Sequence, residues 1–266
     1  MKLIKIAYAI HEYANSNCFF ELRCKYNKFF FCLKSNKGGI FMKKQKEFKM
    51  SRKEYIDFLA SKSDEISMSN KNSKTGIACL NIAFPLDTCR PDAPCREGCY
   101  AGKGCQQIAT VQGAYYRNLR LYHDDPDNFF EQIYCKVKFS GLPKVRWQDS
   151  GDMPDAEFFD RVVDLCKKTP NVKHMMFTKK YEIVNEYINN NGSLPNNLNV
   201  MFSAWHKMWH VPNPYNLGVA YVDFNDKSLN PEFPNNSFIC PGRESTCSAC
   251  GACWSKKLKA VIFHQH

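Results

Sequence analysis

Two kinds of apolar spacing alternate along the chain after residue 74. Short stretches of β-branched and alternating apolar residues predict strands, whereas longer stretches with an apolar residue every three or four positions predict helices. In one such stretch Ile108, Val111, Tyr115 and Leu119 form a single apolar stripe, as on one face of a helix. Strands are expected at Thr75–Leu86, Lys144–Gln148, Val172–Thr178, Asn197–Trp205, Leu217–Phe224 and Leu258–His264. Helices are expected at Met50–Ile66, Cys105–His123, Pro126–Ser140, Met153–Lys168 and Lys179–Asn190.

Strands that alternate with helices in this way indicate βαβ units and a mainly parallel sheet. The sequence therefore predicts an α/β fold whose sheet is a complete or partial (β/α) barrel, with an open α/β sheet as the alternative. Neither GxGxxG nor GxxxxGK[ST] occurs, which disfavours a Rossmann or P-loop nucleotide site. In both architectures ligands bind at the carboxyl ends of the strands.

Polar and cysteine-rich segments follow five of the predicted strands. They are Cys89–Cys105, Ser150–Asp152, Thr178–Lys180, Ser203–His206 and Cys240–Cys253. Because parallel strands end at the same edge of a sheet, we expect all five segments to gather at one mouth.

Residues 1–50 differ in charge from the rest of the chain. They hold 11 Lys/Arg and 3 Asp/Glu, whereas residues 51–266 hold 26 and 23. Most of the net charge of +11 therefore belongs to this segment, and total charge is weak support for a nucleic-acid partner. We expect a basic N-terminal appendage, either not native or poorly ordered, with a genuine small subdomain as the alternative. Residues 51–266 are expected to form a single α/β domain with two cysteine-rich loops.

The chain offers no membrane segment and no secretory signal. No stretch approaches the roughly 18 to 20 apolar residues of a membrane span, and MKLIKIAYAI runs into HEYANSNC rather than a small-residue cleavage site. Fourteen cysteines are present, and in a reducing cytoplasm clustered cysteines are more often metal ligands than disulfides. We therefore expect a cytoplasmic, metal-binding protein without a membrane partner.

The first cysteine window, Thr88–Cys105, contains Cys89, Cys95, Cys99 and Cys105. Its gaps of five, three and five residues let a loop wrap around a compact cluster, and three glycines permit the tight turns this needs. Zinc sites usually have C-x2–4-C pairs. The spacing therefore favours an iron–sulfur cluster, with zinc or no metal as the alternatives.

The second cysteine window contains Cys240, Cys247, Cys250 and Cys253. Two successive C-x2-C steps with a further, more distant cysteine are typical of iron–sulfur proteins, and the same four thiolates also suit tetrahedral zinc. The sequence does not decide whether the two windows hold one or two 4Fe-4S clusters or share a metal.

Two other groups of polar residues carry weaker signals. Lys179 and Lys180 at a strand end could bind a carboxylate or phosphate, although a solvated surface is the more frequent explanation. Two Trp-His pairs, Trp205-His206 and Trp209-His210, lack the glutamate of an HExxH zinc motif, so we predict aromatic packing for them.

Several stretches of the sequence resemble a known family: CREGCYAGKG, RNL at Arg117–Leu119, VRWQDSGDM, FTKK at Phe177–Lys180 and CSACGACW…VIFHQH. Together they resemble the phage gene product 88 family over roughly residues 74–266. In placing a cysteine-rich loop that ends in CYA after the first strand, the chain is also similar to the phage gene products 37/68. Both groups resemble radical S-adenosylmethionine (SAM) enzymes as distant relatives.

The resemblance to radical SAM enzymes implies roles for Ser150, Gly151 and Asp152. They stand where those barrels bind the methionine amino group of SAM, so Asp152 would accept from the ammonium and Gly151 would let the backbone approach. The alternative is local: Asp152 precedes Met153-Pro154 and would cap the next helix.

The first window departs from the radical SAM pattern. Those enzymes typically use C-x3-C-x2-C, whose three thiolates leave one iron open for SAM, whereas this chain has Cys89-x5-Cys95-x3-Cys99. A fourth thiolate from Cys105 would close the cluster. The expected function is an iron–sulfur enzyme of radical-SAM-like type, with an unknown substrate and an electron donor as partners. The alternative is a zinc-stabilised module that binds nucleic acid or protein without catalysis.

Overall fold

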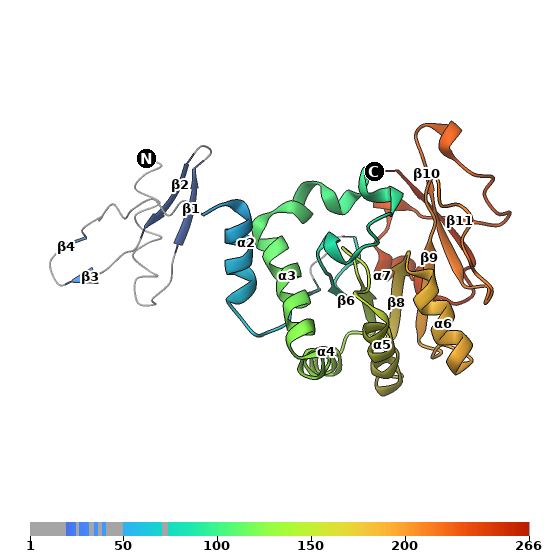
Figure 1. Cartoon of the computed structure of the whole chain (residues 1–266), viewed down its shortest axis with the longest axis horizontal. Helices are drawn as coiled ribbons and strands as arrows, with labels where there is room; N and C mark the ends of the chain where they lie inside the picture. Colours follow the sequence, from blue (N-terminus) through green and yellow to red (C-terminus); the bar gives the residue numbers. More distant parts are fainter. Residues whose placement is uncertain are drawn as a thin grey trace. The chain divides into compact units, whose positions relative to one another are not determined.

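A computed structural model describes residues 20–24, 27–31, 35–36, 39–40, 50–70 and 74–265 (Figure 1). The chain divides into two compact units, Met1–Ser51 and Arg52–His266. The described residues of the first unit form two antiparallel pairs. These are β1 (Phe20–Cys24) with β2 (Asn27–Phe31) and β3 (Ser35–Asn36) with β4 (Gly39–Ile40). Most of residues 1–50 lie outside the described residues, so the expectation of an appendage stays a prediction.

The second unit contains an eight-stranded sheet in the order β11-β12-β10-β9-β8-β7-β6-β5. All neighbouring strands are parallel except β5 and β6, which are antiparallel. The predicted α/β class with a mainly parallel sheet is thereby confirmed. The strands are β5 (Met68–Ser69), β6 (Cys79–Ile82), β7 (Lys144–Trp147), β8 (Lys173–Thr178), β9 (Leu198–Ser203), β10 (Gly218–Asp223), β11 (Phe238–Ile239) and β12 (Ala260–His264).

Helices connect most of these strands (Figure 1). They are α2 (Arg52–Ser61), α3 (Ala109–Asp124), α4 (Pro126–Ser140), α5 (Ala156–Lys168), α6 (Tyr181–Asn191) and the single turn α7 (Cys247–Cys250). Within the described residues, none is both long and apolar enough to cross a lipid bilayer.

Local side-chain chemistry sets the helix ends. The Asp125 carboxylate accepts a hydrogen bond from Asn128 N (3.0 Å) at the start of α4, where Pro126 occupies the first turn. In α5 the Asp155 carboxylate accepts from Phe158 N (2.8 Å). Gly141 ends α4 with φ 65°, the left-handed conformation that glycine adopts without a steric penalty.

The strands present two different faces, because successive side chains point to opposite sides. On one face Ile82, Trp147 and Phe202 belong to the main hydrophobic core together with residues of α3 to α6; the Trp147 ring meets Phe158 of α5 at 5.9 Å between centroids. On the other face Cys79 packs in a separate, smaller cluster. We call this second side the inner face of the sheet.

A directional chain of hydrogen bonds runs through the core beside β8. Trp147 Nε1 donates to His174 Nδ1 (3.3 Å), and His174 Nε2 lies 3.0 Å from Thr169 Oγ1, which itself donates to Leu165 O (2.8 Å). Since the indole can only donate, Nδ1 accepts and Nε2 carries the proton. Burial lowers the pKa of His174 to about 3, so the ring is neutral. Both ring nitrogens and the Thr169 hydroxyl then have hydrogen-bond partners.

The last connection of the sheet crosses the inner face. Because β11 and β12 are parallel neighbours, residues 240–259 must return from the carboxyl end of one strand to the amino end of the next. On the way Trp254 Nε1 donates to Val145 O (3.2 Å), and Asn199 Nδ2 donates to Cys253 O (2.8 Å). The second cysteine window therefore lies against the inner face.

Candidate functional site

The first cysteine window is a succession of short 3-10 turns at the carboxyl end of β6. Its turns span Leu86–Thr88, Pro94–Arg96, Tyr100–Gly102 and Gly104–Gln107. Cys89 N donates to Leu86 O (3.1 Å), and Gly102 N donates to Cys99 O (3.0 Å). The loop is thus tightly folded by its own backbone, and its cysteines are fixed relative to the strand end.

Three cysteines of this window act on one another electrostatically. The pKa of the Cys89 thiol is raised to about 12, mainly by burial and also by Asp152 and the thiols of Cys95 and Cys99, while Lys179 opposes the rise. Burial also raises the pKa of Cys95, whose sulfur is hydrogen-bonded by the Lys179 ammonium. These three thiols therefore belong to one electrostatic group beside Lys179.

Cys105 differs from the other three cysteines of the window. It is exposed, and its charge helps to raise the pKa of Tyr115 on α3. It lies in the 3-10 turn Gly104–Gln107, just before α3, which begins at Ala109 and not at Cys105 as predicted.

Gly151 allows the ends of β6 and β7 to approach closely. It has φ 74°, and a Cβ at this position would lie 2.6 Å from Thr88 Oγ1 and 2.7 Å from Pro85 O. Phe84 N donates to Ser150 O (3.0 Å), and Asp152 N donates to Thr88 Oγ1 (2.9 Å). The turn after β7 is thus joined to the start of the first cysteine window, as only glycine permits.

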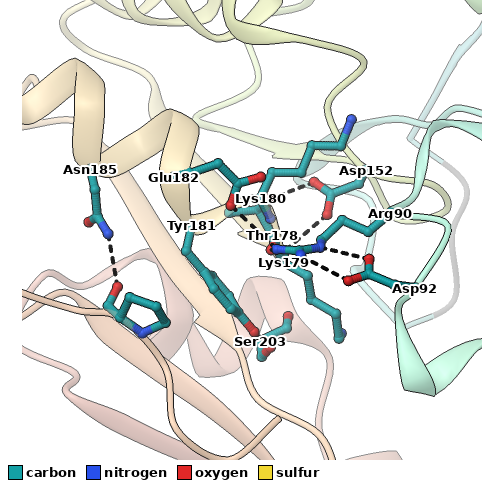
Figure 2. A network of polar contacts seen from close by, with 11 residues as sticks. Arg90, Asp92, Asp152, Thr178, Lys179, Lys180, Tyr181, Glu182, Asn185 and Ser203 are labelled. Carbon is teal, nitrogen blue, oxygen red and sulfur yellow. Dashed lines mark hydrogen bonds and ion pairs between the residues drawn. The ribbon is translucent and has the colours of Figure 1, made fainter.

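Asp152 joins the ends of β7 and β8 through its buried carboxylate (Figure 2). Its Oδ1 accepts from Thr178 Oγ1 (2.7 Å) and Met153 N (2.8 Å), and its Oδ2 accepts from Lys179 N (2.9 Å). Burial raises the pKa of Asp152, and these hydrogen bonds oppose the rise. The capping alternative is wrong, because the N-cap of α5 is Asp155.

Several buried polar atoms near the end of β7 have no partner among the described residues. They are both amide atoms of Gln148, Ser150 Oγ and Arg146 Nε, with Asn81 Oδ1 on the paired strand β6. An unpaired polar group in the interior costs about 1–3 kcal/mol, so such a concentration marks a place that water or a ligand completes. Gln148 also has a positive φ of 46°, a strained backbone typical of functional turns.

A pocket of about 560 Å³ opens beside Cys89, between the first window, α3 and α6. Its lining includes Arg90, Lys180 and His123. Figure 2 shows the Arg90 guanidinium beside Asp92 (3.0 Å), and the guanidinium also lies 3.4 Å from Glu182. Lys180 Nζ donates to Pro154 O (2.7 Å). The pocket thus combines opposite charges next to one of the predicted thiol ligands.

The second cysteine window does not stay at the mouth where the first one lies. Cys247 N donates to Lys74 O (2.8 Å), Ser248 N donates to Thr75 O (2.9 Å), and Lys144 Nζ donates to Ser248 O (2.7 Å). These partners precede β6 or begin β7. The expectation that all five segments gather at one edge is therefore wrong for Cys247–Cys253, because the chain must return to the amino end of β12.

The thiols of the second window are close to one another and to cations. The pKa of Cys253 is raised to about 12, mainly by burial and also by Cys247, Cys240 and Cys250. Arg146 opposes the rise at Cys253 and, together with Lys74, also opposes it at Cys247. All four predicted cysteines are therefore brought together.

A fifth thiol, missed by the sequence interpretation, belongs to the same region. Cys79 is fully buried on the inner face of β6, in the small core cluster against which Cys247 and Cys253 pack. Only the strand register brings it there. The sequence indicates this place only through strand geometry: Cys79 and Leu80 are neighbours on β6, so their side chains point to opposite faces of the sheet.

Arg146 of β7 lies between the two windows. Burial raises the pKa of Cys79 and Cys247 on one side and of Tyr100 on the other, and the charge of Arg146 opposes the rise at all three. The Tyr100 hydroxyl donates to Asp149 O. The two cysteine windows are therefore separate groups that share one cation.

The remaining predicted groups also have definite places. Trp205 and Trp209 pack on Phe224 at 5.0 and 6.0 Å between ring centroids, which confirms aromatic packing for the Trp-His pairs. Lys179 lies over the Trp205 ring (5.9 Å). Among residues 50–70 and 74–265, no three His, Cys, Asp or Glu side chains are arranged to hold a single metal ion.

A family model described as Gene product 88 matches residues 57–256 of the chain. No curated protein and no solved structure gives a match. The matched region includes both cysteine windows and the Ser150–Asp152 turn.

Proposed function

Because the chain belongs to the gene product 88 family, whose description names no reaction, we propose from the site itself that it is an iron–sulfur protein of radical-SAM-like type. One cluster would be held by Cys89, Cys95 and Cys99. A second would be held by the four cysteines of the second window. The substrate is an unidentified molecule that reaches the first window at the carboxyl edge of the sheet.

The strand order supports a partial (β/α) barrel. Strands β6 to β10 follow one another in sequence order and are all parallel. Their main core includes residues of α3 to α6, while the return segment 240–259 contacts the inner face. A doubly wound sheet instead carries helices on both faces and reverses its order in the middle.

The division of the first window into three thiols and one carries the proposal. Cys95 and Cys99 both act on Cys89, and Lys179 acts on Cys89 and Cys95, whereas Cys105 is exposed and lies just before α3. Three thiolates leave one iron of a four-iron cluster without a protein ligand, whereas a fourth would close it. This arrangement supports an enzyme over a closed electron carrier.

Among residues 50–70 and 74–265 no three His, Cys, Asp or Glu side chains are arranged to hold one ion, which supports an iron–sulfur group over a single ion. One zinc ion draws four thiolates to about 2.3 Å from a common point, while a cluster holds its thiolates farther apart at separate irons. When bound, such a cluster with an open iron supplies the electron that reductively cleaves SAM.

The chain's own groups would hold and orient the ligand. Gln148 and Ser150 bring buried donors and acceptors without partners. Asp152 fixes the relative positions of the ends of β6, β7 and β8: its backbone N–H donates to Thr88 Oγ1, and its two carboxylate oxygens accept from Thr178 and Lys179. We therefore propose that ligand contact is made by Gln148 and Ser150, with Asp152 as a positioning residue for the SAM site.

The second window is proposed to hold an auxiliary cluster. Lys74 and Arg146 face its thiols, and positive charge offsets the negative charge that several thiolates bring to a metal. An electron donor is the expected partner of a protein with two such clusters. Zinc bound by the same thiolates is the alternative outcome.

Anaerobic purification followed by iron, sulfide and zinc analysis tests the proposal. We expect brown protein with iron and sulfide in equal amounts. Cys95→Ala should lose one cluster and Cys250→Ala the other, whereas Cys135→Ala, on the outer helix α4, should lose none. Colourless protein with stoichiometric zinc would overturn the iron–sulfur proposal.

The open iron is tested separately by EPR of the reduced protein. Addition of SAM should change the signal of the parent and of Cys105→Ala alike, because Cys105 is not a ligand. A parent signal that ignores SAM, together with a Cys105→Ala signal that responds, would mean a closed four-thiolate cluster.

A further inference from the structure

The edge of the sheet opposite to the first cysteine window is rich in lysine. The segments that lead into β7, β8, β9, β10 and β12 are residues 141–144, 169–173, 192–198, 213–218 and 255–260. They contain Lys144, Lys173, Lys256, Lys257 and Lys259 and not one Asp or Glu. Because these strands are parallel, the segments lie along one edge, which we call the lysine edge.

The charges of this edge are not neutralised within the described part of the chain. Lys173, Lys257 and Lys259 are exposed, and none of the ion pairs among the described residues includes them. Lys259 Nζ donates to a neutral acceptor, Asn216 O (2.7 Å). Elsewhere on the surface, by contrast, Lys227 pairs with Asp223 (2.6 Å).

Exposed aromatic rings accompany these lysines. Phe139, in the last turn of α4 just before residue 141, is 77% exposed, although a phenylalanine ring is ordinarily buried. Lys138 Nζ lies 5.8 Å from the centre of the Phe139 ring. Tyr215, three residues before β10, is 37% exposed. The edge thus combines uncompensated positive charge with rings that have a free face.

From these two observations we propose that the lysine edge binds single-stranded nucleic acid. Lysines attract the phosphate backbone, and unpaired bases stack on exposed aromatic rings. Between the starts of β7 and β12 the edge spans four strand spacings, about 19 Å, enough for several nucleotides. A duplex has no free base faces to stack on Phe139. An acidic protein would pair with the lysines but would leave the exposed Phe139 ring unexplained.

The location leaves the first cysteine window free. That window lies at the carboxyl ends of the strands and the lysine edge at their amino ends, so a bound strand would not cover Cys89 or its pocket.

Fluorescence anisotropy of a labelled oligothymidylate with the full chain tests the lysines. Lys173→Ala/Lys257→Ala/Lys259→Ala should weaken binding at least about tenfold and make the slope of log K against log salt shallower by about 2. The matched control is Lys53→Ala/Lys62→Ala/Lys227→Ala, which removes the same charge from exposed positions elsewhere. It should change the affinity much less, and any contribution of the basic residues 1–50 is common to both variants.

Stacking is tested at Phe139. Phe139→Ala should weaken oligonucleotide binding about tenfold, whereas Phe139→Trp should bind as tightly as the parent because the indole also offers a ring face. The fluorescence of the added indole should be quenched by the oligonucleotide. Phe139→Leu, apolar but without a ring face, should behave like the alanine variant.

Three results would overturn the proposal. One is equal binding by the parent and the triple edge variant. Another is duplex bound as tightly as a single strand of equal length, with no effect of Phe139. The third is loss of binding to anionic phospholipid vesicles or polyglutamate in the edge variant while oligothymidylate binding is unchanged, which would assign the surface to a different partner.

Discussion

At the scale of residues, some site residues can be predicted from their spacing in the sequence, whereas others are brought to the site only by strand register. The cysteine windows and the Ser150–Asp152 turn are visible because their spacing along the chain is itself the signal. Arg146, Gln148 and Cys79 are not, because each stands in or beside a short strand. Their importance arises only when β6 and β7 pair and the return segment covers the inner face.

Replacement of Gly151 should show how tightly the strand ends are packed. Gly151→Ala places a methyl group against Thr88 Oγ1 and Pro85 O at a positive φ, so we expect a loss of about 3 kcal/mol in the free energy of unfolding. Gly141→Ala is the control, because Gly141 is in the left-handed helical conformation with φ 65° and has no atom within 4 Å of the added Cβ, and it should cost about 1 kcal/mol. Equal losses in urea unfolding would mean that the close approach has no energetic weight.

His174 predicts a specific dependence of stability on pH. Its pKa is about 3 in the folded chain and about 6.5 when unfolded, so the unfolded chain binds more protons in this window. The free energy of unfolding therefore keeps its full value above pH 6.5 and falls by about 1.4 kcal/mol per pH unit as the pH is lowered toward 3. His174→Gln should remove that part of the slope in urea titrations between pH 6.5 and 4.5. A variant with the parent's slope would contradict a neutral buried ring.

At the scale of elements, sequence periodicity locates helices and strands but places their ends less well. The expected helix at Pro126–Ser140 matches α4, because Pro126 and the residue after Ser140, Gly141, are strong local signals. The expected strand at Thr75–Leu86 reduces to Cys79–Ile82, since its residues beyond Ile82 join the turn after β7 instead of a neighbouring strand. Such ends depend on partners distant in sequence.

The two aspartate caps should differ in strength. Asp125→Ala removes only the bond to Asn128 N and should cost about 1 kcal/mol. The Asp155 carboxylate also accepts from the buried Tyr122 hydroxyl (2.6 Å), so Asp155→Ala should cost about 2–3 kcal/mol. Thermal unfolding of Tyr122→Phe, Asp155→Ala and their combination checks the coupling, since strictly additive losses would exclude it.

At the scale of the whole molecule, the sequence predicts a parallel α/β sheet correctly but not the path of its last connection. Insertion of β12 between β10 and β11 is decided by long-range pairing, which no local pattern encodes. It carries the second cysteine window from the mouth to the inner face. The first proposed site therefore lies at the carboxyl ends of the strands, and the second lies against the inner face of the same sheet.

Removal of the metal proposed for the second window should loosen this return segment first. The segment contacts β7 and β9 through Trp254 and Asn199, and bound metal favours the folded arrangement of its thiols. We expect hydrogen exchange after anaerobic chelation to rise in residues 240–259 more than in α4 or α5. Uniform exchange across the second unit would instead indicate one cooperative structure without a distinct metal-stabilised part.

The place of β12 also determines the order in which the protein can be assembled. During synthesis β11 emerges before β12, and in the described structure β12 is the only sheet neighbour of β11. Neither β11 nor the cysteines between β11 and β12 can take their folded positions until β12 has been made. At about 5–20 residues per second, those thiols remain accessible for seconds while the rest of the sheet already forms. If the second window binds the proposed metal, a cell that supplies the metal late would accumulate chains whose helices are packed but whose strands β11 and β12 are still free to pair with another chain.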